Sequence, residues 1–196
     1  MTNQEQEQQP TLDLTFPHDW TAEILEQWPQ ILPARRYVYP SRAMDLEPEE
    51  AGYGALHLTV RPAVGRPFLA TFALGYDDPA VPSGLWSCPD PGWLCAVSGG
   101  YAYVIDTAAP ERFAQLAIRP VLEVHALPTQ ELLLFAGHHT LTAWGKEGEA
   151  WQSARVSAEG IRLDHVEGGV LHGFGWDMMA DAEVPFALDL RTGMRV

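Results

Sequence analysis

Three glycines stand at a fixed interval in the second half of the chain, and this interval constrains the fold more than any other feature. Gly99, Gly137 and Gly175 are 38 residues apart, and each closes a short apolar run. The three runs lie at 93–97, 132–135 and 170–174. Self-similarity at a period near 40 is typical of repeat architectures whose units each hold several strands. We therefore expect a series of similar β units.

Further strands are predicted on both sides of each glycine. In chain order, the predicted strands are 55–60, 68–74, 93–97, 101–106, 121–127, 132–135, 139–144, 150–156, 161–166, 170–174 and 186–190. The first two form a hairpin, because the Gly and Pro residues between them favour a turn. Residues 177–184 break the period and are interpreted as an insertion in the third unit. The predicted fold class is all-β, with β-propeller-like repeated antiparallel meanders that stay open or incomplete.

One short helix is predicted ahead of the strands, at about 19–28. Trp20, Ile24 and Trp28 recur there at helical spacing, an aspartate precedes them as an N-cap, and a proline stops the pattern. This helix is expected to lay its tryptophans on the β body.

The chain is expected to form one domain behind a polar tail. Residues 1–15, rich in Gln and Glu at their start, are predicted to be disordered, and residues 16–196 to fold as a single domain. No apolar run approaches the length of about 18 residues that a membrane-spanning helix needs. The first residues lack the pattern of a secretory signal, so a cytoplasmic location is expected.

Three segments resemble the blades of quinoprotein-type β-propellers, namely 103–107, 143–151 and 187–193. In such blades a strand ending in Asp is followed by a turn containing Gly and by a Trp on the next strand. The resemblance covers roughly residues 93–193 and implies a propeller-like architecture. The whole chain is also similar to uncharacterised bacterial proteins with the same layout. No set of residues matches a pyrroloquinoline-quinone site, so no cofactor is expected.

The number of repeats is small for a closed ring. A closed propeller needs about four or more blades, whereas the repeats here supply little more than two, with the N-terminal hairpin completing the last unit. Such blades leave sheet edges and one apolar face unpaired. The helix and loops can cover them, two sheets can wrap into a sandwich, or a second copy can pair with them. A homodimer is therefore one expected arrangement.

The charge of the chain narrows the classes of partner. Twelve Lys and Arg residues against 26 Asp and Glu residues leave a formal net charge of −14. A surface this negative repels a phosphate backbone, so nucleic-acid binding is not expected. It suits a protein partner with a basic surface, or it serves solubility alone.

The histidines are the best raw material for chemistry, but their order along the chain is unfavourable. His138 and His139 are adjacent, as are Asp164 and His165, and neighbouring strand residues point to opposite faces. His172 lies in a β run, where a core or rim imidazole is the usual role. No metal ligand set is therefore expected.

The cysteines and serines indicate no reaction either. Cys88 and Cys95 lack the second cysteine pair of a zinc site, and Cys95 alternates with apolar residues as a core residue does. Ser98 lies in a Gly-rich turn without the G-x-S-x-G elbow of a hydrolase. No catalytic residue is assigned.

A binding surface is the remaining hypothesis. Trp176 and Asp177 open the predicted insertion, and insertions in repeat proteins map to loops that are often the binding face. The full candidate surface consists of Trp176, Asp177, His172, His138, His139 and Trp86. A flat acidic face would indicate a non-catalytic protein-interaction module. A deep cleft gathering His172, Trp176, Asp177 and His138 would indicate the alternative, a small-molecule or carbohydrate-binding domain that could include a hydrolytic site.

Overall fold

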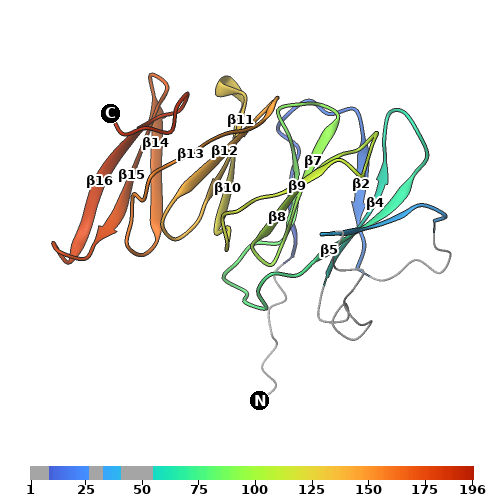
Figure 1. Ribbon diagram of the computed structural model, residues 1–196, viewed down its shortest axis with the longest axis horizontal. Coiled ribbons are helices and arrows are strands. Elements are labelled where there is room, and N and C mark those ends of the chain that lie inside the picture. The colour runs from blue at the N-terminus through green and yellow to red at the C-terminus, as the bar shows by residue number, and fades with distance from the viewer. Residues whose placement is uncertain (1–8, 27–32, 41–54) are drawn as a thin grey trace, which may run out of the picture.

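Four β-sheets stacked in a row make up the protein (Figure 1). The computed structural model describes residues 9–26, 33–40 and 55–196. All its regular elements in these ranges are strands, apart from the 3-10 turn η2 at Pro128–Gln130. The fold class is therefore all-β, as the alternating sequence predicted. Within these ranges no helix is long and apolar enough to cross a membrane.

The two sheets at the N-terminal end of the row combine hairpins with parallel outer strands. Sheet I has the strand order β2 (Thr21–Ile24), β4 (Ala55–Arg61), β5 (Phe68–Ala73), β3 (Arg36–Tyr39). Sheet II has the order β1 (Thr11–Asp13), β6 (Gly84–Ser87), β7 (Trp93–Ser98), β8 (Tyr101–Asp106), β9 (Phe113–Gln115). β3 is parallel to β5 and β1 is parallel to β6, whereas the other neighbours are antiparallel.

The other two sheets are antiparallel meanders in which strands follow the order of the chain. Sheet III consists of β10 (Glu123–Leu127), β11 (Leu132–Ala136), β12 (Leu141–Gly145) and β13 (Gly148–Gln152). Sheet IV consists of β14 (Ile161–Glu167), β15 (Val170–Asp177) and β16 (Ala182–Asp189). β7, β11 and β15 recur at the predicted period, one in each of sheets II, III and IV. The repeat predicted from the glycines is therefore present as a repeated strand.

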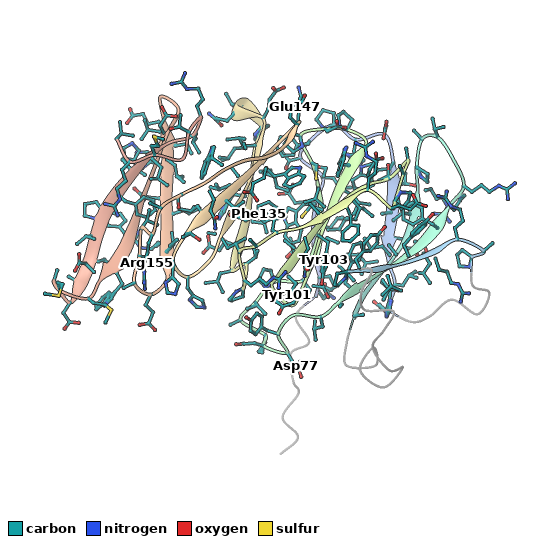
Figure 2. All side chains as sticks on the ribbon, in the orientation of Figure 1. Asp77, Tyr101, Tyr103, Phe135, Glu147 and Arg155 are labelled. Carbon is teal, nitrogen blue, oxygen red and sulfur yellow. The ribbon has the colours of Figure 1, made fainter. Side chains whose placement is uncertain are left out.

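The core lies between neighbouring sheets, in three layers. Strand β11 shows why, since Leu133 and Phe135 pack toward sheet II while Leu134 and Ala136 pack toward sheet IV. Sheets I and II enclose a third layer of the same kind. Figure 2 shows Phe135 and Tyr103 inside this packing, with Asp77, Glu147 and Arg155 at its periphery. Strands buried on both faces read as continuous apolar runs, which explains the runs in the sequence.

The period glycines lie at or near the end of a central strand, where a linker between two sheets passes close to it. A Cβ atom added at Gly99 or Gly175 would stand 2.4 Å from a linker carbonyl oxygen, and one at Gly137 would stand 2.9 Å from a linker side chain. These linker atoms belong to Tyr76 for Gly99, to Ile118 for Gly137 and to Val156 for Gly175. Only glycine permits such close approach of another chain segment. The glycines therefore recur because a linker passes close to each of them.

The predicted helix at 19–28 is wrong over the described residues. Strand β2 occupies Thr21–Ile24 and pairs with β4, while Trp28 lies outside the described residues. A spacing of four residues is compatible with a strand as well as a helix, because it is a multiple of two. Trp20 is buried and packs against the core between sheets I and II, as was expected of its side chain.

Several other predicted boundaries differ from the structure, among them those of the tail and of the insertion. In the tail predicted at 1–15, residues 1–8 lie outside the described residues, but Thr11–Asp13 form β1. The residues 177–184 interpreted as an insertion lengthen a hairpin, since Trp176 pairs with Glu183 and Asp177 with Ala182. Both segments gain order from strand pairing, which a local pattern of polar residues does not reveal.

Candidate functional site

Sheet IV ends the row, and its outward side is the candidate site. Its inward residues Leu171, Phe186 and Leu188 are buried against sheet III. Strand alternation and cross-strand pairing place the outward residues together. This terminal face consists of Arg162, His165, Glu167, His172, Phe174, Trp176 and Glu183. All of them are exposed or half-buried.

A tight turn aligns two histidines on this face, beside a bulge. Gly168 and Gly169, both at positive φ, form the turn between β14 and β15, so Glu167 pairs with Val170 and His165 with His172. A register shift between Leu163 and His165 marks a β-bulge there. The two imidazole rings stack with centroids 4.6 Å apart and planes 8° apart.

The bulge also interrupts the strand alternation, which in a regular strand places neighbours such as Asp164 and His165 on opposite faces. His165 Nδ1 lies 2.8 Å from Asp164 Oδ2, so neighbouring side chains meet. A bulge re-aims side chains in this way because two residues of one strand face a single residue of the other. One ligand atom each from His165, Glu167 and His172 lie within 4.8 Å of one another. These residues could hold a metal ion, which the sequence did not predict.

The other half of the terminal face is aromatic and charged. The Arg162 guanidinium carbon lies 4.2 Å from the centre of the Phe174 ring, a cation–π contact. Arg162 Nη2 also donates to Glu183 Oε2 at 3.0 Å, and this hydrogen bond raises the pKa of Arg162. Trp176 beside them is 36% exposed. Arg162 is thus held over the face by contacts on both sides.

The tip of the β15–β16 hairpin adds exposed apolar surface next to Trp176. Met178 and Met179 are 75% and 95% exposed. Asp177 shapes this tip, because its Oδ1 accepts hydrogen bonds from the backbone N–H groups of Met179 and Ala180. These two hydrogen bonds lower the pKa of Asp177, and the bond from Ala180 has the larger effect. Asp177 therefore has a structural role in the turn.

Five of the six predicted surface residues lie at the surface, in two separate places. Trp176, Asp177 and His172 lie on or next to the terminal face. His138 and His139 lie in the turn between β11 and β12, both exposed, with ring centroids 6.0 Å apart and tilted by 45°. They do not take part in the histidine cluster of sheet IV.

The prediction that Trp86 belongs to the binding surface is wrong, because the residue is buried. Its side chain is 3% exposed and packs in the core between sheets II and III. The Pro- and Gly-rich loop before it suggested a position at a sheet end. Strand β6 instead lies between β1 and β7, and the face of sheet II that carries Trp86 packs against sheet III.

None of the six predicted residues lines either of two hollows in the described part of the chain. One, of about 370 Å³, is lined by Gln130, Leu132, Gly169, Leu190 and Arg191. The other, of about 460 Å³, is lined by Gln9, Pro10, Leu12, Ala22, Glu23, Ile24 and Glu26. The terminal face is therefore a sheet surface rather than the lining of either hollow.

The thiols and the Gly-turn serine are structural. Cys88 and Cys95 are free and fully buried, and burial raises the pKa of both thiols. Ser98 is buried as well, and its Oγ donates to the Phe72 carbonyl oxygen at 3.1 Å. These groups lie away from solvent, as the core role predicted for Cys95 implies.

Sequence reasoning missed five residues of the terminal face: Arg162, His165, Glu167, Phe174 and Glu183. One signal could have found the histidine pair. A two-residue Gly-Gly turn between β runs pairs residues at equal distances on either side, which puts His165 opposite His172. The bulge at Asp164 has no comparable local signal.

Comparisons with known proteins add no relative. No protein-family model matches the chain, and no curated protein sequence matches it. The functional argument therefore depends on the terminal face itself.

Proposed function

We propose that the protein is a non-catalytic interaction module that binds a basic protein partner through the terminal face of sheet IV. The observation that carries this proposal is an acidic, aromatic sheet face that no other described residue covers, at the end of a row of packed sheets. Sheet IV and its two hairpin turns, residues 161–189, hold one basic residue, Arg162, against six carboxylates. The six are Asp164, Glu167, Asp177, Asp181, Glu183 and Asp189.

The composition of the face suits a protein interface. Aromatic residues, Met and Arg are enriched in such interfaces, and Trp176, Phe174, Arg162 and Met179 lie together at one end of the hairpin. Carboxylates around them supply the charge that steers a cationic partner and selects against acidic ones. Contact area and charge thus favour the same class of partner.

The proposal includes a propeller-like arrangement of the four sheets. Successive meanders that pack face to face, each joined to the next by a linker, are the arrangement of propeller blades. Sheets III and IV fit this description, whereas sheets I and II carry parallel outer strands. In the described part of the chain, the open row leaves sheet IV without a neighbouring sheet beyond it. A partner that covers sheet IV would take the place of the next blade. The open row of packed sheets supports the incomplete propeller that the quinoprotein-type resemblance implies.

A basic partner is favoured over a second copy of the chain. Two copies meeting at sheet IV would bring two acidic faces together within a molecule of net charge −14. Like charges placed face to face disfavour association. A homodimer through this face is therefore an alternative outcome of the test.

The test combines partner capture with binding measured on purified proteins. Wild type, Trp176→Ala and the control Val64→Ser are used to capture partners from an extract of the source cells, and a captured protein is then purified. Val64 is 76% exposed and lies in the β4–β5 turn of sheet I, at the other end of the row. Binding by calorimetry should weaken about tenfold or more with Trp176→Ala and stay unchanged with Val64→Ser.

Salt dependence checks the charge argument. Affinity for the captured protein should fall as ionic strength rises, because screening weakens attraction between opposite charges. The proposal is wrong if the captured protein is acidic, if Val64→Ser weakens binding as much as Trp176→Ala, or if the only partner is a second copy.

A further inference from the structure

We propose a binding site for a divalent transition-metal ion of the zinc type on sheet IV, with His165, Glu167 and His172 as its ligands. This inference does not rest on the interaction function, because it concerns the opposite end of the terminal face from the hairpin tip. The three ligand atoms already lie within 4.8 Å of one another. Two imidazoles and one carboxylate form a ligand set that zinc takes in proteins.

The backbone holds the two histidines in place. The two-residue Gly168–Gly169 turn makes His165 and His172 directly opposed partners of β14 and β15, and the register shifts only beyond this pair. Their rings stack in parallel with centroids 4.6 Å apart, so both imidazoles project from the sheet side by side. Glu167 is two residues beyond His165 on the same strand and therefore on the same face.

Asp164 supplies the second layer of the site. A carboxylate accepts a hydrogen bond and cannot donate one when ionised, so the 2.8 Å contact makes His165 Nδ1 the protonated nitrogen. The lone pair of His165 then lies on Nε2, the nitrogen free to bind a metal. Carboxylates that accept from the second ring nitrogen orient metal-binding histidines in this way. Asp164 is thus a positioning residue.

The ligand chemistry selects the class of ion. Imidazole nitrogen suits zinc, copper, nickel and iron, whereas magnesium and calcium prefer sites made of oxygen atoms. With metal–ligand bonds of about 2.0–2.1 Å, tetrahedral geometry puts ligand atoms about 3.3 Å apart. His165 and Glu167 are exposed and His172 is half-buried, so small side-chain rotations close the remaining gap. Three ligands leave a fourth position for water.

The test measures metal binding by untagged protein, since an oligohistidine tag would bind the same ions. Calorimetry with zinc chloride should show one ion per chain. His165→Gln and His172→Gln should each weaken binding more than about tenfold, and Asp164→Asn should weaken it about 10–100-fold. The matched control is the double variant His138→Gln with His139→Gln, which removes the other exposed histidine pair and should leave binding unchanged.

Two further measurements use wild-type protein alone, so they test the proposal even if a variant fails to fold. Cobalt(II) added to wild type should give the intense visible bands of a tetrahedral nitrogen–oxygen site. Zinc should also protect His165 and His172, but not His138 and His139, from carbethoxylation, which is mapped by mass spectrometry. The proposal fails if zinc does not bind, if binding follows His138 and His139, or if zinc leaves His165 and His172 unprotected.

Discussion

At the scale of single residues, the period glycines show that a repeat can arise from close packing. Gly99, Gly137 and Gly175 recur because each lies under a linker that passes from one sheet to the next. The sequence alone predicted a repeat from them, and the structure supplies the reason. All three are packed too closely for a side chain, and Gly99 also adopts a positive φ of 53° that favours glycine.

Replacing a period glycine should destabilise the protein. In Gly175→Ala the new Cβ would stand 2.4 Å from the Val156 carbonyl oxygen, so the backbone must shift. We expect a loss of about 1–3 kcal/mol in the free energy of unfolding. The control Gly145→Ala, whose Cβ would find its nearest neighbour at 3.7 Å, should change it by less than about 0.5 kcal/mol. Urea unfolding of both variants measures the difference, and equal losses would contradict the steric role.

Buried tyrosines predict loss of stability at alkaline pH. Tyr103 donates its hydroxyl hydrogen to the Ala73 carbonyl oxygen at 3.0 Å, and Tyr39 donates to the Pro110 carbonyl oxygen at 2.7 Å. Burial raises the pKa of both phenols. Above about pH 10 the unfolded chain releases these protons while the folded chain keeps them, so stability is complete below that pH and falls above it.

The variant Tyr103→Phe tests this pH dependence. Losing the hydrogen bond should cost about 0.5–1.5 kcal/mol at neutral pH. The slope of unfolding free energy against pH above about pH 10 should become shallower, because one group fewer titrates on unfolding. Denaturant unfolding at several pH values measures the slope, and a slope equal to that of wild type would refute the assignment.

At the scale of elements, sheets II and III are the rigid centre of the row. Each is packed on both faces, and all five residues of β11 are buried. β14 in sheet IV has no buried residue. In stacked repeats stability depends on contacts between neighbours, so an end unit with one interface opens more readily.

Hydrogen exchange should follow this order. Amides of β7, β8 and β11 should exchange slowest and those of β14 fastest, measured by mass spectrometry on native protein. Zinc bound between β14 and β15 should slow exchange in both strands and leave sheet II unchanged. Equal protection of β14 and β11 without metal would contradict the order.

At the scale of the whole molecule, charge and shape together predict a monomer. The chain has a mass of 21.7 kDa and a net charge of −14, and its uncovered terminal face is acidic. Light scattering after size exclusion should give the monomer mass at low salt, where repulsion is least screened. A dimer that forms at low salt would instead indicate that the open row completes itself with a second copy.

Much of the fold could be predicted from the sequence because strand patterns are local. The alternation at Tyr101–Asp106 predicted β8 with its boundaries, and the hairpin of β4 and β5 followed from Gly and Pro in the turn. The helix prediction failed because spacing of four residues fits two kinds of element. Of the candidate site, the sequence indicated Trp176 and His172, but it missed their neighbours on β14 and β16.

Most strands from β4 onward, the repeat and the acidic charge could be predicted from the sequence, since each is a property of neighbouring residues or of composition. Three other features emerge only in the folded chain: Trp86 is buried, His165 and Asp164 meet, and sheet IV ends the row. These features depend on which strand edges pair and where a bulge shifts the register. Such pairing joins residues distant in the chain, so no local pattern encodes it.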